Sequence, residues 1–300
     1  MLTITEFSKL NPDPLQAGVV EIFARENPVL ASLGFQNIAG NAYSYNLEDT
    51  LPGIAFRGFN EGYVESTGVI LPQTEALRIL GGDSDYDTAQ IAMQTGDNNT
   101  RAVHDAMKAK ALALAWLKTF FTGDNGTNPK EFDGLVNRLT GGQVVSAGTN
   151  GAQLTLDMLD DLIDAVTGEP TQLLMNKPLR RKITQLARGT SNLSWAVDDF
   201  GRQIAVYAGI PIGIVEDGAD GDPILDFDET KGTSAVTSSI YAVKFAPDTM
   251  HGIQTAPVSV RDLGEINEKP ALRTRIEWYS GVVVKHPRAA ARLAGVLRPA

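Results

Sequence analysis

Apolar side chains recur every three or four positions along residues 97–122, the longest such run in the chain. One set of recurring positions is Val103, Met107, Ala111, Leu114, Leu117 and Phe121. A second set, in the C-terminal half of the run, is Leu112, Trp116 and Phe120. This spacing predicts an α-helix over residues 98–122, whose second half is buried nearly all round. The first half is expected to turn its charged residues to water: Arg101, Asp105 and Lys108.

Between residues 41 and 80, apolar and polar residues alternate in two stretches, which predicts two β-strands. The alternating positions are Tyr43, Tyr45 and Leu47 in the first stretch and Glu75, Leu77 and Ile79 in the second. The glycine-rich segment between them carries large apolar residues: Ile54, Phe56, Phe59, Tyr63, Val69 and Ile70. An isolated hairpin offers these side chains little cover. We therefore expect an extended hairpin loop that lies against a partner surface.

The N-terminal segment predicts a short amphipathic helix. Asp13 as cap, Pro14 at the first helical position and Gln16 form a typical helix start. The apolar face of this helix is formed by Leu15, Val19, Ile22 and Phe23. We expect Asn27-Pro28 to end the helix, which leaves an arm with no core of its own.

The remaining chain mixes helices and strands. Thr155 is placed to cap one helix, and Pro178 opens another, whose basic residues point outward: Arg180, Arg181, Lys182 and Arg188. Apolar runs predict buried strands at residues 171–175, 204–215 and 240–245, and a hairpin over residues 258–279. This order predicts an α/β or α+β body.

Charge is distributed unevenly along the 300 residues. The chain has a net charge of −10, yet residues 269–300 contain seven Lys or Arg and a single acid, Glu277. Either this segment is a solvated basic edge, or it meets an acidic surface on a neighbouring copy. The acidic total argues against tight general binding of nucleic acid. The absence of cysteine excludes disulfides and thiolate chemistry, and no apolar run is long enough for a membrane span.

Catalytic patterns are mostly missing. Phosphate-binding, hydrolase and zinc-protease motifs do not occur, and the three histidines are far apart in sequence. Four aspartates crowd the helix that follows Thr155, but all lie off its apolar face, as expected for a solvated surface: Asp157, Asp160, Asp161 and Asp164. The Asp217–Glu229 loop is rich in oxygen ligands but does not match an EF-hand. We expect no catalytic residue, no cofactor and no metal site.

Several short phrases, in this order, resemble the major capsid proteins of tailed bacteriophages with the Hong Kong 97-type fold. The phrases are Phe132–Leu135, Leu173–Pro178, Tyr207–Ile212, Val260–Glu265, Arg275–Tyr279 and His286–Arg288. The resemblance implies an α+β fold with an N-terminal arm, an extended β-hairpin loop, a peripheral domain with a long spine helix, and an axial domain. The implied ranges are an arm at 1–40, the loop at 41–80, a peripheral domain at 81–134 and 248–284 with its spine helix at 98–122, and an axial domain at 135–247 and 285–300.

By this resemblance, copies of the chain would form pentamers and hexamers of an icosahedral head that encloses double-stranded DNA through weak contacts. It also implies a location in the virion capsid, assembly in the host cytoplasm, a portal, a separate scaffolding protein or a removed scaffolding segment, and possible decoration by another protein. An encapsulin-like shell of a cellular nanocompartment is the alternative. A soluble enzyme that uses the Asp-rich helix is a third hypothesis.

The expected contacts between subunits involve the loop, the arm and the basic C-terminal segment. The residues are Ile54, Phe56, Arg57, Phe59, Tyr63, Leu15, Val19, Phe23, Arg273, Arg275, Arg288 and Arg292. Some relatives join subunits by Lys–Asn bonds from the loop. No Lys occurs between Leu10 and Met107, so the sequence does not support a crosslink of that form.

Overall fold

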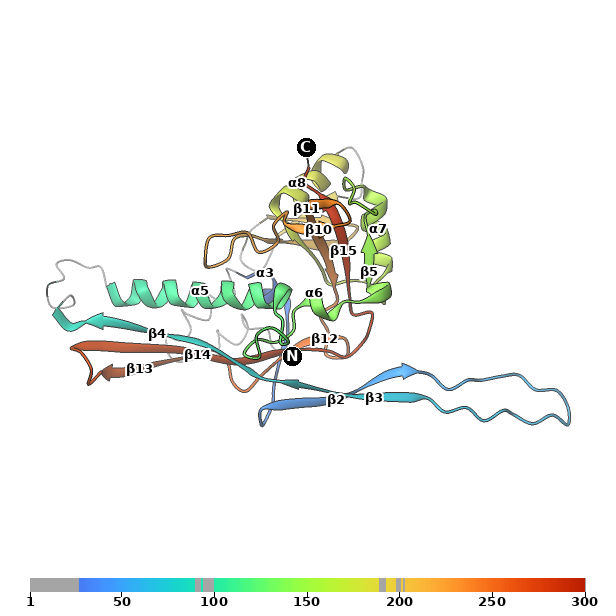
Figure 1. Cartoon of the computed structure of the whole chain (residues 1–300), viewed down its shortest axis with the longest axis horizontal. Coiled ribbons are helices and arrows are strands. Elements are labelled where there is room, and N and C mark those ends of the chain that lie inside the picture. The colour runs from blue at the N-terminus through green and yellow to red at the C-terminus, as the bar shows by residue number, and fades with distance from the viewer. Residues whose placement is uncertain are drawn as a thin grey trace.

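The computed structural model describes residues 27–89, 93, 100–188, 193–197, 201 and 203–299. Figure 1 shows a layered body, a long band of strands with helix α5 beside it, and a hairpin that projects away from both. In the described ranges, the helical segments are α3 (Pro28–Ser32), α5 (Thr100–Thr122), α6 (Leu135–Arg138), η1 (Gly141–Gln143), α7 (Leu156–Asp164) and α8 (Lys177–Leu186). Helices and sheets are both present, as predicted for an α+β chain.

The band is a five-stranded sheet built on one long strand, β14. Its strands are β1 (Phe35–Asn37), β4 (Arg78–Asp87), β12 (Met250–Gln254), β13 (Ser259–Glu265) and β14 (Ala271–Val284). Strand β4 pairs antiparallel with β14 from Arg78–Ser280 to Asp87–Ala271. Strands β12 and β13 pair with the other edge of β14, and β1 adds to β12 in parallel. Thr274, Ile276 and Trp278 are buried on one face, as their alternation predicts.

The body contains an eight-stranded sheet with the order β5-β15-β11-β6-β9-β8-β7, and β10 pairs with β11. Its strands are β5 (Val144–Ser146), β6 (Gln172–Asn176), β7 (Leu193–Val197), β8 (Gln203–Tyr207), β9 (Ile210–Val215), β10 (Glu229–Lys231), β11 (Ser234–Val243) and β15 (Ala290–Leu297). Strand β6 is buried along its whole length and pairs in parallel with β9. Central parallel strands are buried on both faces, so their sequences are continuous apolar runs. This pattern predicted the strand at residues 171–175.

Side-chain caps begin both helices of the body, and the sequence predicted the one at Thr155. The Thr155 side chain accepts a hydrogen bond from the backbone N–H of Met158 at 3.4 Å and begins α7. The Asn176 side chain accepts from the N–H of Leu179 at 3.0 Å, and Pro178 lies in the first turn of α8. Both helices bury their apolar sides in one cluster with the sheet.

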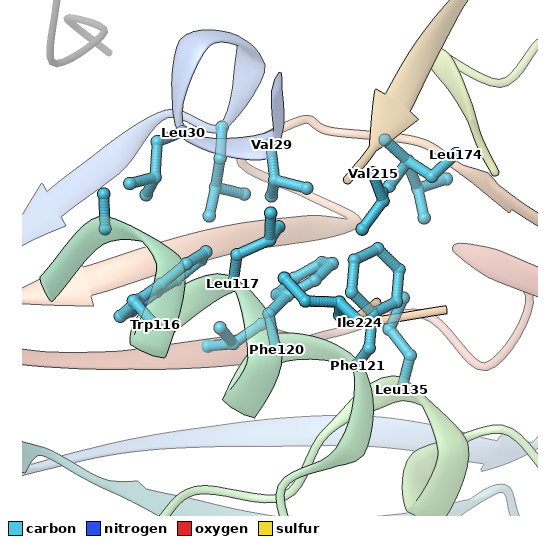
Figure 2. Packing of buried hydrophobic residues seen from close by; sticks show 14 of the residues in the cluster. Val29, Leu30, Trp116, Leu117, Phe120, Phe121, Leu135, Leu174, Val215 and Ile224 are labelled. Atoms are coloured by element: carbon cyan, nitrogen blue, oxygen red, sulfur yellow. The ribbon is translucent and has the colours of Figure 1, made fainter. Parts of the chain in front are cut away.

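The second half of α5 is the centre of the other core cluster. Figure 2 shows Leu117 facing Val29 and Leu30 of α3, while Phe121 lies near Leu135 and Ile224. Trp116 is fully buried, and its indole N–H donates to Ser280 Oγ at 3.1 Å. The expectation of burial nearly all round holds for this half of the helix.

The first half of α5 differs from the prediction. Asp105 is only 2% exposed, whereas Val103 and Met107 are 55% and 63% exposed. The reason is that α5 turns the side chains of Asp105, Ala109 and Trp116 towards the sheet. The side chain of Val103 points away from it. Tyr86 on β4 supplies the partner that a buried carboxylate needs, with its hydroxyl 2.6 Å from Asp105 Oδ1.

The predicted hairpin loop is present, with strands β2 (Ala42–Thr50) and β3 (Val69–Ala76) paired antiparallel. The second strand ends earlier than expected, because Ile79 belongs to β4 of the other sheet. The N–H of Leu77 donates to Asn41 O at 2.8 Å, at the point where the chain changes sheets. Within the described ranges, no helix is long and apolar enough to cross a membrane.

Candidate assembly surfaces

The distal part of the hairpin, residues 51–68, exposes a set of large apolar side chains. Ile54 is 97% exposed, and Phe56 and Phe59 are as exposed as in an extended chain. Figure 1 shows this segment at the end of the hairpin, far from the body and the band. Water contact with so many apolar groups is unfavourable. The loop therefore has the character of a surface that another molecule covers.

Local contacts nevertheless give this loop a shape of its own. Its two sides are joined where the N–H of Gly53 donates to Ser66 Oγ at 2.8 Å. Nearer the tip, the Glu61 carboxylate accepts from the N–H of Gly58 at 2.8 Å. The Arg57 guanidinium lies over the Tyr63 ring, 5.2 Å from its centroid. A loop that is partly ordered before binding loses less entropy when a partner covers it.

Polar contacts hold the root of the hairpin on the rest of the chain. Arg138 binds both carboxylate oxygens of Glu75 on β3, at 2.5 and 2.9 Å. The hydroxyl of Tyr45 donates to Val284 O at 3.0 Å, and burial, followed by the charge of Glu75, raises its pKa. These contacts fix the direction in which the exposed loop projects.

His251 on β12 lies beneath this root and is 1% exposed. The ring of Tyr43 meets it edge-on, with 6.0 Å between centroids. Neither imidazole nitrogen has a hydrogen-bond partner in the described part of the chain. Burial, and then the nearby charge of Lys285, lower the pKa of His251 to about 4. No local pattern around residue 251 indicates this burial.

Two arginines of the basic C-terminal segment form ion pairs across the band. Arg273 binds both oxygens of Asp85 at 2.6 and 2.8 Å, and Arg275 binds both of Asp83 at 2.7 and 2.8 Å. Hydrogen bonds from Arg273, and then from Lys269, hold the pKa of Asp85 well below its usual range. The acidic surface that these arginines meet lies on β4 of their own chain.

The other two predicted arginines also have partners within the chain. Arg288 donates to the carbonyl oxygens of Asp164 and Ala165 at 2.8 and 3.0 Å, at the C-terminal end of α7. A cation at this position also complements the helix dipole. Arg292 binds Glu229 at 2.9 Å. A contact of these four arginines with another subunit stays a prediction, and Leu15, Val19 and Phe23 lie outside the described residues.

The acidic segments considered for chemistry are largely solvated. Asp157 and Asp161 are exposed on α7, and Asp160 accepts a hydrogen bond from Tyr207 at 2.8 Å. Asp220 forms an ion pair with Lys118 of α5 at 2.6 Å. Lys118 also lines a cavity of about 580 Å³, together with residues 222–226, Asp228 and Glu229. No group of three or more His, Asp or Glu side chains in the described ranges is placed to hold a metal ion.

Comparison with known proteins shows which sequences and structures this chain resembles. A sequence family described as "Major capsid protein GP7" matches residues 11–159. No curated protein sequence matches the chain significantly. Among solved structures, the holo-SrpI encapsulin complex from Synechococcus elongatus aligns over 91% of this chain and 88% of its own, with 16% identity and a TM-score of 0.66.

Two further structures show the same fold. The capsid of a native GTA particle aligns over 89% of both chains, with 16% identity and a TM-score of 0.63. A chain of Microbacterium phage Oxtober96 aligns over 90% of this chain and 91% of its own, with 13% identity and a TM-score of 0.64. The match to the capsid-protein family over residues 11–159, and the Hong Kong 97-type fold shared with these capsid and encapsulin structures, make the chain similar to capsid shell proteins.

Proposed function

We propose that this chain is the major head protein of a tailed bacteriophage, and that its pentamers and hexamers close into an icosahedral shell around double-stranded DNA. The observation that carries the proposal is the exposed apolar loop at residues 51–68, because a monomer has no use for it. The role requires no catalytic group and no cofactor.

The proposed assembly assigns a task to each part of the chain. The loop extends over the adjacent subunit and buries Phe56 and Phe59 there. The band with its spine helix α5 acts as the peripheral domain, and the body acts as the axial domain around the five-fold and six-fold axes. The net charge of −10 suits a shell that confines DNA without binding it tightly.

The test replaces Phe56 and Phe59 by Ser in one variant. Both side chains contact little within the chain, so the protein is expected to fold normally, and only contact between copies is lost. Burying one such ring on association contributes about 1.5–3 kcal/mol, and a shell repeats the contact many times. We expect normal circular dichroism and few closed particles in electron micrographs.

A matched control replaces Val236, which is 56% exposed on β11 of the body, by Ser. This variant is expected to form particles in normal yield. Normal particle numbers from the Phe56→Ser, Phe59→Ser variant would show that the loop does not hold copies together.

A cellular nanocompartment that encloses proteins is the second candidate, and the similarity to an encapsulin favours it. The two functions differ in what purified particles contain. Nuclease-resistant double-stranded DNA supports the phage head, whereas particles filled with protein and free of DNA support the nanocompartment.

The phage proposal also involves other proteins. A separate scaffolding protein or a removed scaffolding segment, a portal and a possible decoration protein would act with this chain, and shells would assemble in the host cytoplasm before they become virion capsids. Purification of particles from infected cells, with mass spectrometry of their proteins, tests these partners together.

A further inference from the structure

The two helices of the body carry opposite charges. Within α7, four aspartates occur and no basic residue: Asp157, Asp160, Asp161 and Asp164. From Lys177 to Arg188, helix α8 and its end carry five basic residues and no acid: Lys177, Arg180, Arg181, Lys182 and Arg188. The apolar sides of both helices share one core cluster, so these charges line the outside of the body. Figure 1 shows α7 and α8 on different sides of that body.

Among the described residues, these charges are poorly matched. In the described ranges, no ion pair joins α7 to α8, and Lys177 alone of the basic set has an acidic partner, Glu216 at 3.4 Å. The Nε of Arg180 is buried and has no hydrogen-bond partner there. Asp157 and Asp161 are like charges four residues apart, which destabilise a helix slightly. Opposite charges on another molecule would complement the exposed charges of both helices.

We infer that the acidic face of α7 in one copy docks against the basic face of α8 in the next copy around a ring. The occupant of each face is a second copy of this chain, because the two patches are complementary and lie on one molecule. A contact between two different patches is heterologous, and heterologous contacts that close generate rings. This inference rests on the proposed shell, whose pentamers and hexamers are such rings.

Electrostatic contacts of this kind select the partner and speed association. They also act apart from the apolar loop, which lies at the far end of the hairpin. The loop and the charged helices would therefore serve two separate contacts, one apolar and one ionic. Assembly of the native chain is accordingly expected to slow as salt is added.

The test reverses each patch alone and then both together. One variant carries Asp157→Lys and Asp161→Lys, a second carries Arg181→Glu and Arg188→Glu, and a third carries all four changes. All four positions are exposed, so thermal unfolding monitored by circular dichroism should be close to that of the native chain. Each single reversal turns attraction into repulsion and is expected to weaken each contact roughly tenfold, which greatly lowers the particle yield. The third variant restores the attraction with the signs exchanged, and its yield should recover.

Three outcomes would overturn the inference. If both single reversals form particles as the native chain does, α7 and α8 make no contact between copies, while the proposed shell stands. If the particle yield of the third variant does not recover although the variant is folded, the charges do not act by pairing α7 with α8. If the Arg181→Glu, Arg188→Glu variant forms normal shells that lack nuclease-resistant DNA, α8 faces nucleic acid instead. A native chain that forms no shells removes the proposed function, and the inference with it.

Discussion

Acid is expected to loosen the chain at the root of its hairpin, because His251 is buried there without a hydrogen-bond partner in the described part of the chain. Burial lowers the pKa of this imidazole to about 4, whereas an unfolded chain binds the same proton near pH 6.5. The unfolded state therefore takes up the proton first as the pH falls. The folded state is fully stable above pH 6.5 and loses stability as the pH drops towards 4.

The size of the loss follows from the two pKa values. At pH 5 the difference in proton binding costs about 2 kcal/mol, and below pH 4 the loss approaches ~3 kcal/mol. The paired carboxylates affect stability in a lower range of pH. Hydrogen bonds from Arg275 and Arg273 lower the pKa values of Asp83 and Asp85, so their contribution is present above pH 4 and is lost only in stronger acid.

The assay is urea unfolding at pH 7 and pH 5, followed by tryptophan fluorescence. Trp116 and Trp278 are fully buried, so their emission reports on the core. The variant His251→Leu removes the titrating group and places an apolar side chain in a buried site. We expect it to lose about 2 kcal/mol less than the native chain between pH 7 and pH 5.

The matched control is His104→Gln, which changes an exposed histidine on α5 and should keep the full pH dependence. An equal loss of stability in the native chain and in His251→Leu would refute the reasoning. It would mean that another group binds the proton, or that His251 is protonated in the folded protein without a loss in the free energy of unfolding.

Three further changes test the contacts that position the surfaces. Trp116→Ala empties a fully buried site and leaves Ser280 Oγ without its indole donor, so the free energy of unfolding should fall by about 3–5 kcal/mol, measured in urea. Arg138→Ala leaves Glu75 without its bidentate partner and should cost about 1–3 kcal/mol, while hydrogen exchange at β3 rises; unchanged exchange there would contradict a tether at the hairpin root. Asn176→Ala removes the cap of α8 and the Nδ2 hydrogen bonds to Leu225 O and Ser238 Oγ, so the melting temperature should fall by an amount equivalent to about 1–3 kcal/mol; Asn176→Asp keeps the cap oxygen but sets a buried carboxylate against the Leu225 carbonyl oxygen, and should also lower the melting temperature.

The parts that sequence predicted well were those in which local pattern and tertiary environment agree. The helix at 98–122 is α5, the cap at Thr155 and the helix start at Pro178 are in place, and the hairpin at 41–80 projects as an exposed loop. The exposure of the apolar residues in that loop was predicted because an isolated hairpin contains little that could cover them. Their contact with a neighbouring copy stays a prediction.

The parts that sequence missed depend on groups brought together from distant segments. Asp105 was expected in water, yet Tyr86, 19 residues away, gives it a buried partner. The pairing of Arg273 with Asp85 spans 188 residues, and no local pattern indicates the register between β4 and β14 that produces it. His251 is buried because the hairpin root folds back over β12, which only the three-dimensional arrangement reveals.

In the proposed shell, strand β14 has a mechanical consequence. It is a single segment of 14 residues, about 48 Å long, and the hairpin is bound near its C-terminal end through Tyr45 and Val284. A pull on the hairpin along the band would load the ladder between β14 and β4 in shear, with ten residue pairs resisting at once. Peeling would break those pairs one after another. The chain is thus stiff along the direction in which its loop reaches out and compliant across it.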